Sequence, residues 1–481
     1  MSANWIDRAV AMVAPRAALR RLAARDALLA YEGATSDRRT AGWSASGTSA
    51  NAEVGMGLPK LRDRSRDLIR NNHLAATAAL QWTTKVIGYG ITGRSADETT
   101  NALWMKFTQQ CSADGLPSLE ALQTLASFSV FESGEVFIRR RWRRPGDGMA
   151  VPVQLQVLES DFLDINQNKT LPNGGIIIQG VEFDAIGKRA AYWLFAEHPG
   201  STNMFAALAR GGAAQRVPAD EVAHIYEPRR PGQVRGVPRL APGLMALRDL
   251  ADWEDAELLR KKTEACLAAF VKTNDDAPVG PTSIETAADG TKRRIEKFRP
   301  GMIFYGRPGE DITFNAPQHA GGYEEYKRSR VRDIAAAVGM PYELFRGDYS
   351  QSNYSSSRLG FVGFKDIIGA HQWNVIVPAL ERIKEWFADA ALLNGVTVSR
   401  DFEWAPPPFD MLDRGEEAKA DAQVLELGGM TWPQYIQRNG MDPVKQIAEL
   451  EQWKPKLEAA GVVFGKGNNV AQQPAQQPAA A

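Results

Sequence analysis

Glycine-rich segments are the first place in this sequence where phosphate chemistry could occur. Gly88, Gly90 and Gly93 have the spacing G-x-G-x-x-G, which binds a dinucleotide only when it follows a strand and opens a helix. Here a helical pattern precedes the glycines, so we interpret the segment as the exit from a helix. Residues 461–467 (GVVFGKG) resemble a phosphate-binding loop, but one residue is missing between the glycines and no Ser or Thr is present to hold magnesium.

The histidines and cysteines form no catalytic or metal-binding pattern along the sequence. Cys111 and Cys266 are too few for a disulfide framework or a thiolate zinc site, and they favour a reducing compartment. No G-x-S-x-G nucleophile motif occurs. The sequence therefore predicts no catalytic residue, no metal and no cofactor. The histidines lie singly, with no two at ligand spacing, at His73, His198, His224, His319 and His371.

Two clusters of basic residues could bind phosphate groups. One is the run RRRWRR at residues 139–144, beside a predicted turn. Arginines next to an aromatic ring can contact phosphates or bases. Equally, both clusters can stay solvated or pair with acidic residues across a subunit boundary, so DNA contact and intersubunit contact remain open. The second cluster leads into a long predicted helix and contains Arg229, Arg230, Arg235 and Arg239.

Residues 347–357 (GDYSQSNYSSS) form a polar segment without any aliphatic side chain. Long polar loops between packed helices are uncommon unless they are functional or disordered. This one offers an almost uncharged hydrogen-bonding surface, so it is either a plain linker or a mobile loop that contacts a partner. The candidate contact residues are Tyr349, Gln351, Asn353, Tyr354, Ser355 and Arg358.

Two predicted helices must position this loop. From residue 240 to 258 leucines and alanines recur at helical spacing. Acidic residues precede basic ones there, which suits the helix dipole and a Glu257–Lys261 pair. The second helix is predicted over about 322–338, with Gly339 as its C-cap.

The segment between these two helices, 273–317, is predicted to form a small β module, because short apolar runs alternate there with Pro-Gly turns. Helix, β module, helix and loop then form a hairpin with a tip. An elongated subunit of this kind usually needs neighbouring copies to cover its sides.

The remaining segments alternate between helical and strand patterns. A helix is predicted at 59–87, beginning near Pro59, and short strands are predicted between 128 and 198. Outside these we expect a basic amphipathic helix pair at 1–30, an extended arm at 33–58, a long helix at 358–394, a helical end domain reaching about 466, and a disordered Gln/Pro/Ala-rich tail.

The composition is that of an ordinary globular protein with no net charge. The 481 residues contain 57 Lys+Arg and 57 Asp+Glu. At roughly 150 residues per domain, the length suggests about three domains. Neutrality argues against a protein that coats nucleic acid. No run approaches the ~20 apolar residues of a membrane span, and no secretory signal is expected at residues 1–30.

Six stretches of the sequence form a recognisable series. They are Tyr31-Glu32-Gly33-Ala34 with Arg39 and Trp43, LRDRSRDLIRNN at 61–72, VIGYGI at 86–91, RPGQVRGVP at 230–238, Ile334-Ala335 with Gly339-Met340-Pro341, and NYSSSR at 353–358. Taken in this order, they resemble bacteriophage portal proteins of the lambda family, and the resemblance is collinear from about residue 31 to 450.

The resemblance implies an α+β fold, a portal-type elongated subunit with long stem helices, a β-rich wing, a small β-containing clip and a helical C-terminal crown. It maps these parts as N-terminal helix and arm (1–58), wing (59–237), stem helix (238–272), clip (273–317), stem helix (318–340), channel or tunnel loop (341–357), wing return helix (358–398), crown (399–466) and disordered tail (467–481).

The resemblance also implies a function without enzymatic activity. Copies would form a dodecameric ring at one capsid vertex, the conduit for packaging and ejecting double-stranded DNA without sequence specificity. The implied partners are the terminase, major capsid or scaffold proteins, and neck or tail proteins, but no membrane. We expect assembly in the host cytoplasm and a final place in the virion. The clip residues expected to meet the terminase or neck are Arg299, Phe304, Tyr305 and Arg307.

Three other classes compete with this interpretation. A capsid protease needs a nucleophile constellation, and a terminase subunit needs a true phosphate loop with acidic metal sites; the sequence shows neither. A general duplex-binding module should be basic, whereas this chain sums to zero. A ring associated with a membrane would need apolar spans.

Overall fold

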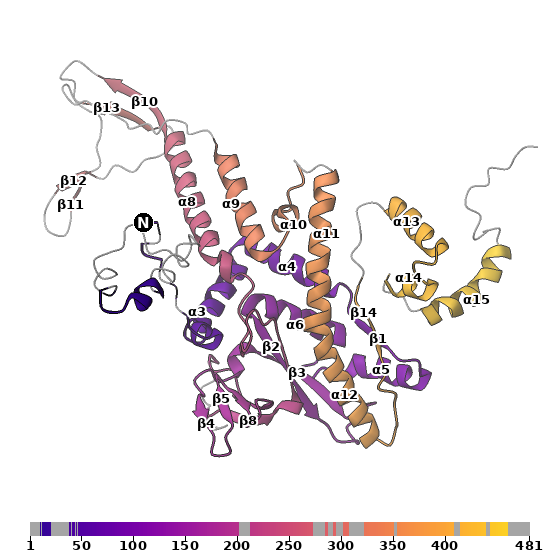
Figure 1. Cartoon of the computed structure of the whole chain (residues 1–481). Helices are drawn as coiled ribbons and strands as arrows, with labels where there is room; N and C mark the ends of the chain where they lie inside the picture. The colour runs from indigo at the N-terminus through magenta and orange to yellow at the C-terminus, as the bar shows by residue number, and fades with distance from the viewer. Residues whose placement is uncertain are drawn as a thin grey trace, which may run out of the picture. The chain divides into compact units, whose positions relative to one another are not determined.

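The fold is described from a computed structural model of the chain (Figure 1). The chain divides into two compact units, residues 1–53 and 54–481, which are described separately. The structure describes residues 10, 12–20, 38–39, 41–43, 45, 47–201, 212–272, 284–286, 292–294, 302–306, 322–350, 354–407, 414–438 and 443–459.

Two consecutive helices, α3 (Ala50–Asn71) and α4 (His73–Ile87), replace the single helix predicted at 59–87. Helix α3 begins nine residues before the predicted start because Ser49 caps it. The Ser49 Oγ accepts a hydrogen bond from the Ala52 amide at 3.3 Å. Pro59 is therefore inside α3. The break falls at Asn72, whose side chain accepts from two amides of α4. Residues 50–58 are thus helical, and the extended-arm prediction was wrong there.

Gly88 ends α4 with φ +53°, and its amide donates to Thr84 O at 2.9 Å. The interpretation of the G-x-G-x-x-G spacing as a helix exit is confirmed.

The central part of unit 2 holds two antiparallel sheets covered by helices. The sequence interpretation did not resolve α5 and α6, but its short strands are confirmed. The three-stranded sheet has the order β3-β2-β9, and the five-stranded sheet runs β4 to β8 in sequence. The bounds are β1 (Thr92–Arg94), α5 (Glu98–Gln110), α6 (Leu119–Ser133), β2 (Glu135–Trp142), β3 (Val153–Glu159), β4 (Lys169–Thr170), β5 (Ile176–Ile178), β6 (Val181–Phe183), β7 (Arg189–Leu194), β8 (Gln215–Pro218) and β9 (Val222–Tyr226), with single 3₁₀ turns at Ser160–Phe162 and Ala219–Glu221.

Apolar cores lie on both sides of strand β2. The larger core packs α4, α6, β2 and the later helices around Trp82, Phe131 and Trp386, all of them buried. The smaller core joins the two sheets through Phe137, Tyr192 and their neighbours. Alternate side chains of β2 therefore face different cores, as the two-residue repeat of a strand requires.

A helical hairpin follows the sheets. A 3₁₀ turn (η4, Ala241–Gly243) leads into α8 (Leu244–Cys266), and α9 (Tyr323–Val338) returns. Gly339 ends α9 at φ +76°, while the Met340 amide donates to Ala335 O, as predicted for this C-cap. Four strands are described around the insert: β10 (Leu267–Lys272), β11 (Ile284–Thr286), β12 (Lys292–Arg294) and β13 (Met302–Gly306). The last three lie within the predicted β module at 273–317, whereas β10 occupies residues that were predicted to be the end of the stem helix.

After the hairpin the chain forms a short helix, a loop and then one long interrupted helix. The short helix is α10 (Tyr342–Arg346). The long helix consists of α11 (Tyr354–His371), a π-helical turn (η5, Gln372–Ile376) and α12 (Val377–Leu393). Strand β14 pairs with β1, and three helices follow. Their bounds are β14 (Glu403–Ala405), α13 (Arg414–Glu426), α14 (Trp432–Arg438) and α15 (Pro443–Ala459).

The mixed α and β architecture predicted from the sequence is confirmed, with helices and small sheets in one chain. Further element boundaries differ from the predicted ones: α8 ends at Cys266 rather than 272, α10 interrupts the predicted loop 341–357, and α11 begins at Tyr354 rather than 358. In the part of the chain that is described, no helix combines the length and apolarity that crossing a membrane requires.

Candidate functional site

The hairpin of α8 and α9 is held by an aromatic and ionic ladder. The Trp253 ring stacks on Tyr323 with centroids 5.0 Å apart and meets Tyr326 at 4.7 Å. Lys327 Nζ lies 2.6 Å from Glu254 Oε1, and partial burial of both groups strengthens this pair. The two helices therefore run antiparallel and in a fixed register (Figure 1).

The outer face of α8 is acidic. Asp249, Asp252 and Asp255 are exposed, and Arg248 pairs with Asp252 at 3.1 Å. The predicted pair between Glu257 and Lys261 is not formed. Glu257 pairs instead with Arg260, at 2.5 Å, and Lys261 lies over the Tyr323 ring.

The polar loop is shorter than predicted, because α10 and α11 occupy both of its ends. Its first turn is fixed by Asp348, whose carboxylate accepts from the Ser350 amide and hydroxyl at 3.1 and 2.6 Å and from the Tyr342 hydroxyl at 3.2 Å. The hydrogen bonds from Ser350 lower the pKa of Asp348 to about 2. Tyr349 is 53% exposed.

The other predicted loop residues divide into two groups. Gln351 and Asn353 lie outside the described residues. Tyr354, Ser355 and Arg358 belong to the first turns of α11, and their side chains lie outside the described part. Their role as contact residues stays a prediction.

The second basic cluster does not form one surface. Arg229 and Arg230 are exposed. Arg235 is 0% exposed and bonded within the chain, so its prediction as a contact to DNA or another subunit was wrong. Arg239 is also engaged, since its Nη1 donates to Glu227 at 3.0 Å and its Nε to Val338 O at 3.0 Å. Only the first two arginines remain candidates for outside contact.

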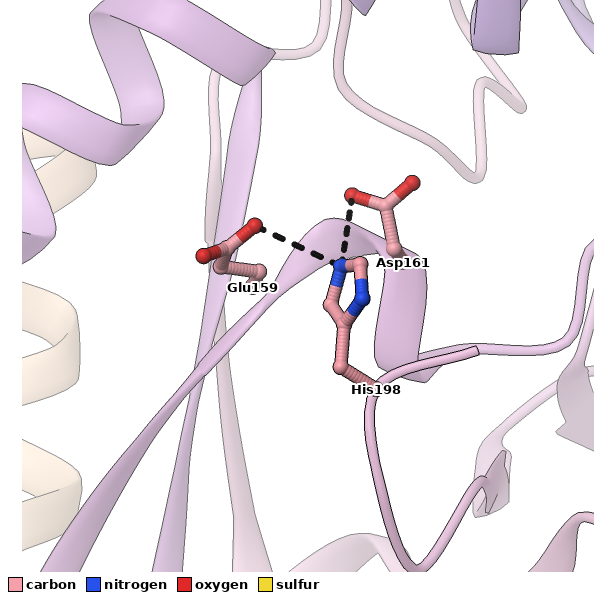
Figure 2. A group of neighbouring side chains, drawn as sticks. All are labelled: Glu159, Asp161 and His198. Carbon is pink, nitrogen blue, oxygen red and sulfur yellow. Dashed lines mark ion pairs between the residues drawn. The ribbon is translucent and has the colours of Figure 1, made fainter. Parts of the chain in front are cut away.

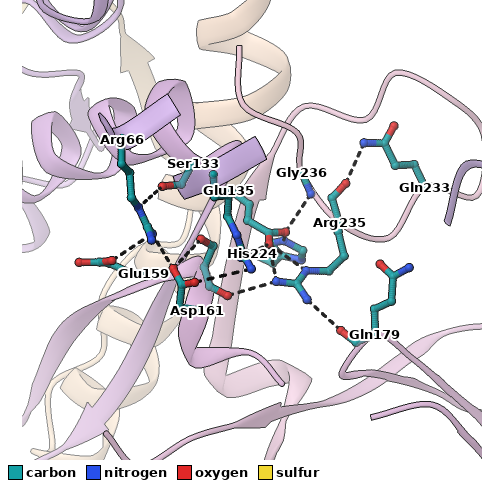
Figure 3. A network of polar contacts seen from close by, with 12 residues as sticks. Arg66, Ser133, Glu135, Glu159, Asp161, Gln179, His224, Gln233, Arg235 and Gly236 are labelled. Carbon is teal, nitrogen blue, oxygen red and sulfur yellow. Dashed lines mark hydrogen bonds and ion pairs between the residues drawn. The ribbon is translucent and has the colours of Figure 1, made fainter. Parts of the chain in front are cut away.

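Arg235 belongs to a buried charged network around Glu135, at the start of β2 (Figure 3). Arg235 donates to Glu135 Oε1 from Nη2 at 2.5 Å and from Nε at 2.8 Å. The Gly236 amide donates to Oε2 at 2.8 Å. Burial alone would raise the pKa of Glu135, but Arg235 and His224 outweigh it and hold this pKa far below its usual range.

His224 continues the network and is neutral in it. Its Nε2 lies 3.0 Å from Glu135 Oε2, and its Nδ1 lies 3.0 Å from the Arg189 guanidinium. An arginine can only donate, so Nδ1 accepts and Nε2 carries the proton. Burial lowers the pKa of His224 and keeps the ring uncharged.

The remaining bonds of Arg235 tie loops to the sheets. Its Nη1 donates to Gln179 O at 3.0 Å and its Nη2 to Ser160 O at 3.1 Å. The Gln233 side chain accepts from the Arg229 and Arg230 amides. The motif RPGQVRG is therefore a structural joint between the two sheets.

A second ionic group lies beside this network (Figure 2), where His198 Nε2 faces Glu159 Oε2 at 3.6 Å and Asp161 Oδ2 at 3.9 Å. Three such side chains can ligate a metal ion. However, Arg66 Nη2 lies 3.0 Å from the same Glu159 oxygen and 2.5 Å from the same Asp161 oxygen (Figure 3). Because a guanidinium occupies these oxygens, we describe the group as an ion-pair cluster.

The first basic cluster is used in part within the chain. Arg140 is mostly buried, between Asp220 at 3.7 Å and Asp389 at 3.8 Å, and lies over the Trp142 ring at 4.5 Å. Arg141 donates to Gln156 at 2.8 Å. These two arginines therefore join β2 to its neighbours, while Arg143 and Arg144 at the end of the cluster are exposed.

The predicted clip residues fall on or near strand β13. Phe304 and Tyr305 belong to this strand, which pairs in parallel with β10 through Phe304↔Phe270 and Tyr305↔Val271. Arg299 and Arg307 lie outside the described residues. Their role as a docking surface stays a prediction.

One cysteine can be judged for enzymatic chemistry. Cys111 is buried, and burial raises the pKa of its thiol to about 12. A thiol of this kind stays protonated at neutral pH and is a poor nucleophile.

Glu135 is the residue that sequence reasoning missed. The signal was an acidic residue directly after Gly134, at the start of an apolar strand. A buried acid requires a buried partner, but only the fold reveals that Arg235 supplies it.

Two antiparallel sheets, a helical hairpin and a polar loop make up the central part of the structure that is described. The family model "Phage portal protein, lambda family" matches residues 36–372, more than half of the chain. The chain belongs to this family of phage portal proteins.

Individual relatives carry the same description. The chain is similar to the probable portal protein of Halomonas phage phiHAP-1, with 28% identity over 81% of this chain and 79% of the relative. It is similar to portal protein B of Escherichia phage lambda, with 21% identity over 87% and 88%. The portal protein of Escherichia phage N15 is 20% identical over 50% of this chain and 51% of the relative.

Among solved structures, the chain is similar to a component of a gene transfer agent particle. It resembles a chain of the neck of the native particle, reported with C12 symmetry, at 17% identity and a TM-score of 0.41, covering 79% of this chain and 94% of that chain. A chain of the neck of the empty particle gives 16% identity and a TM-score of 0.41, with the same coverage.

Proposed function

We propose that copies of this chain close into a ring at one vertex of a phage capsid, and that double-stranded DNA passes through the ring during packaging and ejection. The observation that carries this proposal is the portal family match, which spans the sheets, the hairpin and the polar loop. A ring of twelve copies is the number implied by the family resemblance. Side-by-side closure requires heterologous interfaces related by one rotation.

The parts of the portal subunit are proposed as follows. The helices and sheets from α3 to β9 form the wing, α8 and α9 form the stem, and residues 273–317 form the clip. The loop after α10 is the channel loop, α11 to α12 returns through the wing, and α13 to α15 form the crown. The aromatic ladder of Trp253 supports the stem assignment, because a stem must transmit load between its two helices.

The neutral charge of the chain and of its polar loop supports the proposed role as a conduit for DNA. Each Lys or Arg in contact with a phosphate adds affinity through counterion release, so a channel rich in such contacts would hold DNA. The chain sums to zero charge, and residues 349–353 (YSQSN) carry none. A neutral hydrogen-bonding loop can touch a moving duplex without retaining it.

The outer acidic face of α8 fits the same proposal. Asp249, Asp252 and Asp255 repel phosphate groups wherever they approach DNA. They are proposed to lie at subunit contacts or to face water.

Partners are proposed from the family. The clip, with Phe304 and Tyr305 on β13, would dock the terminase and later the neck or tail proteins, while the wing would meet major capsid or scaffold proteins. Assembly would take place in the host cytoplasm before the ring becomes part of the virion. The enzyme alternative, a capsid protease or a terminase subunit, gains no support from Cys111, whose thiol stays protonated at neutral pH.

One experiment tests the ring. Purified full-length protein is imaged by negative stain and weighed by native mass spectrometry, alone and with head-assembly partners. Rings with a central hole wide enough for a duplex support the proposal. Compact single particles under both conditions overturn it.

A second experiment tests the channel loop separately. Residues 349–353 are replaced by Gly-Ser-Gly-Ser-Gly, which keeps the loop length and leaves both flanking helices intact. We expect intact rings and impaired DNA packaging or retention. The matched control replaces residues 145–149 (PGDGM), a turn of the same length between β2 and β3, and should package normally. Normal packaging by the 349–353 variant would contradict the loop assignment alone.

A further inference from the structure

Arg239 joins the base of the α8–α9 hairpin to the rest of unit 2. Its guanidinium lies 3.6 Å from the centre of the Trp82 ring of α4. Its Nε donates to Val338 O at the end of α9, and its Nη1 donates to Glu227, which follows β9. Its own amide donates to Phe131 O of α6 at 3.1 Å. This one residue therefore contacts four separate parts of the fold.

His371, the last residue of α11, lies at the same joint. Its ring meets the edge of Trp82 with centroids 5.2 Å apart, and its side chain is 4% exposed. Among the described residues, no protein atom hydrogen-bonds either ring nitrogen. Buried polar atoms in proteins are nearly always bonded, because leaving one unbonded costs free energy. The His371 ring therefore needs a partner other than the protein atoms that the structure describes.

A cavity of about 10 Å³ lies beside this ring, between Trp82, Phe131, Glu227, Arg239 and His371. This volume is close to the ~10–15 Å³ that one water molecule requires. The walls supply a carboxylate acceptor and guanidinium donors. Glu227 Oε2 is 3.9 Å from His371 Nδ1, too far for a direct hydrogen bond but within reach of one bridging water.

We propose that this cavity binds one ordered water molecule, which donates a hydrogen bond to the Glu227 carboxylate and makes a second one to a ring nitrogen of His371. The water links α11 to the base of the hairpin through Glu227, whose carboxylate also accepts from Arg239. The proposal stands on the cavity and its contacts and is independent of the proposed ring.

The test is a map of the full-length protein at a resolution where ordered waters are seen, for wild type, His371→Phe and His73→Phe. Phenylalanine keeps a ring against Trp82 but removes both nitrogens, and His73 is exposed, which makes it the matched control. In wild type and in His73→Phe we expect a water peak about 2.7–3.2 Å from both Glu227 and His371. In His371→Phe we expect this peak to be lost or displaced.

Two results would overturn the proposal. One is a wild-type cavity without a peak, including the case in which His371 and Glu227 bond directly. The other is a peak at an unchanged position in His371→Phe, since that water would not depend on the imidazole. The wild-type map decides alone if His371→Phe fails to fold.

Discussion

The Arg235 guanidinium donates two hydrogen bonds to a single carboxylate oxygen of Glu135, and both side chains are 0% exposed. A charge pair so far from water is tolerated because the neighbouring groups satisfy the other oxygen: the Gly236 amide and the neutral His224 ring both bond it. The pair fixes the segment before the hairpin to β2, the central strand of the three-stranded sheet. The pair therefore anchors the segment that leads into the hairpin on the sheet.

Removing the charge of Glu135 should destabilise the fold strongly. Glu135→Gln leaves Arg235 buried without its counter-charge, for which the expected cost is on the order of 3–5 kcal/mol. The control Glu98→Gln alters a carboxylate that is 85% exposed and 3.4 Å from Arg94, so it should cost less than about 1 kcal/mol. Urea unfolding of both variants measures the difference, and equal midpoints would contradict a central role for the pair.

Stability should fall in acid, beginning near neutral pH. Burial, and then the charge of Arg239, lower the pKa of His371 from 6.5 to about 3. The unfolded chain therefore takes up a proton below pH 6.5 that the folded chain refuses down to about pH 3. The free energy of unfolding decreases as the pH falls through this window. His224 adds a loss in the same direction, since its pKa is also lowered.

The variant His371→Phe isolates the contribution of His371 to this loss of stability in acid. Each proton that only the unfolded chain binds lowers the free energy of unfolding by up to about 1.4 kcal/mol per pH unit. The variant lacks one such proton, so its free energy of unfolding should fall less steeply between pH 6 and pH 4. Its slope should equal that of wild type above pH 7, where the ring is neutral in both states. Chemical unfolding at a fixed protein concentration checks this, and parallel curves throughout would refute the assignment.

Gly134→Ala should be far more damaging than Gly187→Ala. Both glycines have positive φ, +89° and +84°, which costs an alanine roughly 1–2 kcal/mol. A Cβ at Gly134 would also lie 2.4 Å from the Val237 carbonyl carbon and 2.6 Å from Pro238 N, whereas nothing lies within 4 Å at Gly187. The difference in unfolding free energy between the variants measures the close approach alone. Equal losses of unfolding free energy in the two variants would show that the backbone at Val237 moves aside without a free-energy cost.

Trp253→Ala should loosen the hairpin without unfolding the sheets. The substitution removes both aromatic contacts to α9, which are worth about 0.5–1.5 kcal/mol each beyond the buried area. Faster hydrogen exchange is expected in α8 and α9, with unchanged exchange in β2. Leu259→Ala, on the exposed face of α8, is the control and should change little. Uniform acceleration across the whole chain would indicate global destabilisation instead.

Residues close to an element in the sequence predicted the end of α9 and the position of β2 correctly. Gly339 followed by Pro341 marked the end of α9, and the alternating pattern at Val136 marked β2. Signals that depend on one capping residue were overlooked, namely Ser49 at the start of α3 and Asn72 between α3 and α4. Both have the ordinary side-chain chemistry of an N-cap, so the sequence did contain the information that places these two boundaries.

The site could not be predicted to the same extent, because its contacts join distant segments. Arg235 belongs to a basic cluster that invites an outward role, and nothing near it reveals that its partner is 100 residues away. Likewise, the spacing of His198 from Glu159 and Asp161 gives no sign that they meet. Pairing between elements is a property of the packed fold, which sequence periodicity does not encode.

The π-helical turn between α11 and α12 helps to keep a row of side chains on the buried face. This row repeats every four residues, which is longer than one turn of an α-helix. Fully or nearly buried side chains recur every four residues at Phe364, Ile368, Gln372, Ile376 and Leu380. Four residues overshoot one α-helical turn by roughly 40°, so an unbroken α-helix would rotate this stripe by about 160° over the four steps. The wider turn at Gln372–Ile376 absorbs part of that rotation. Deleting a single residue there would swivel every side chain of α12 away from the core by about 100°, so this stretch should accept substitutions far more readily than a change in length.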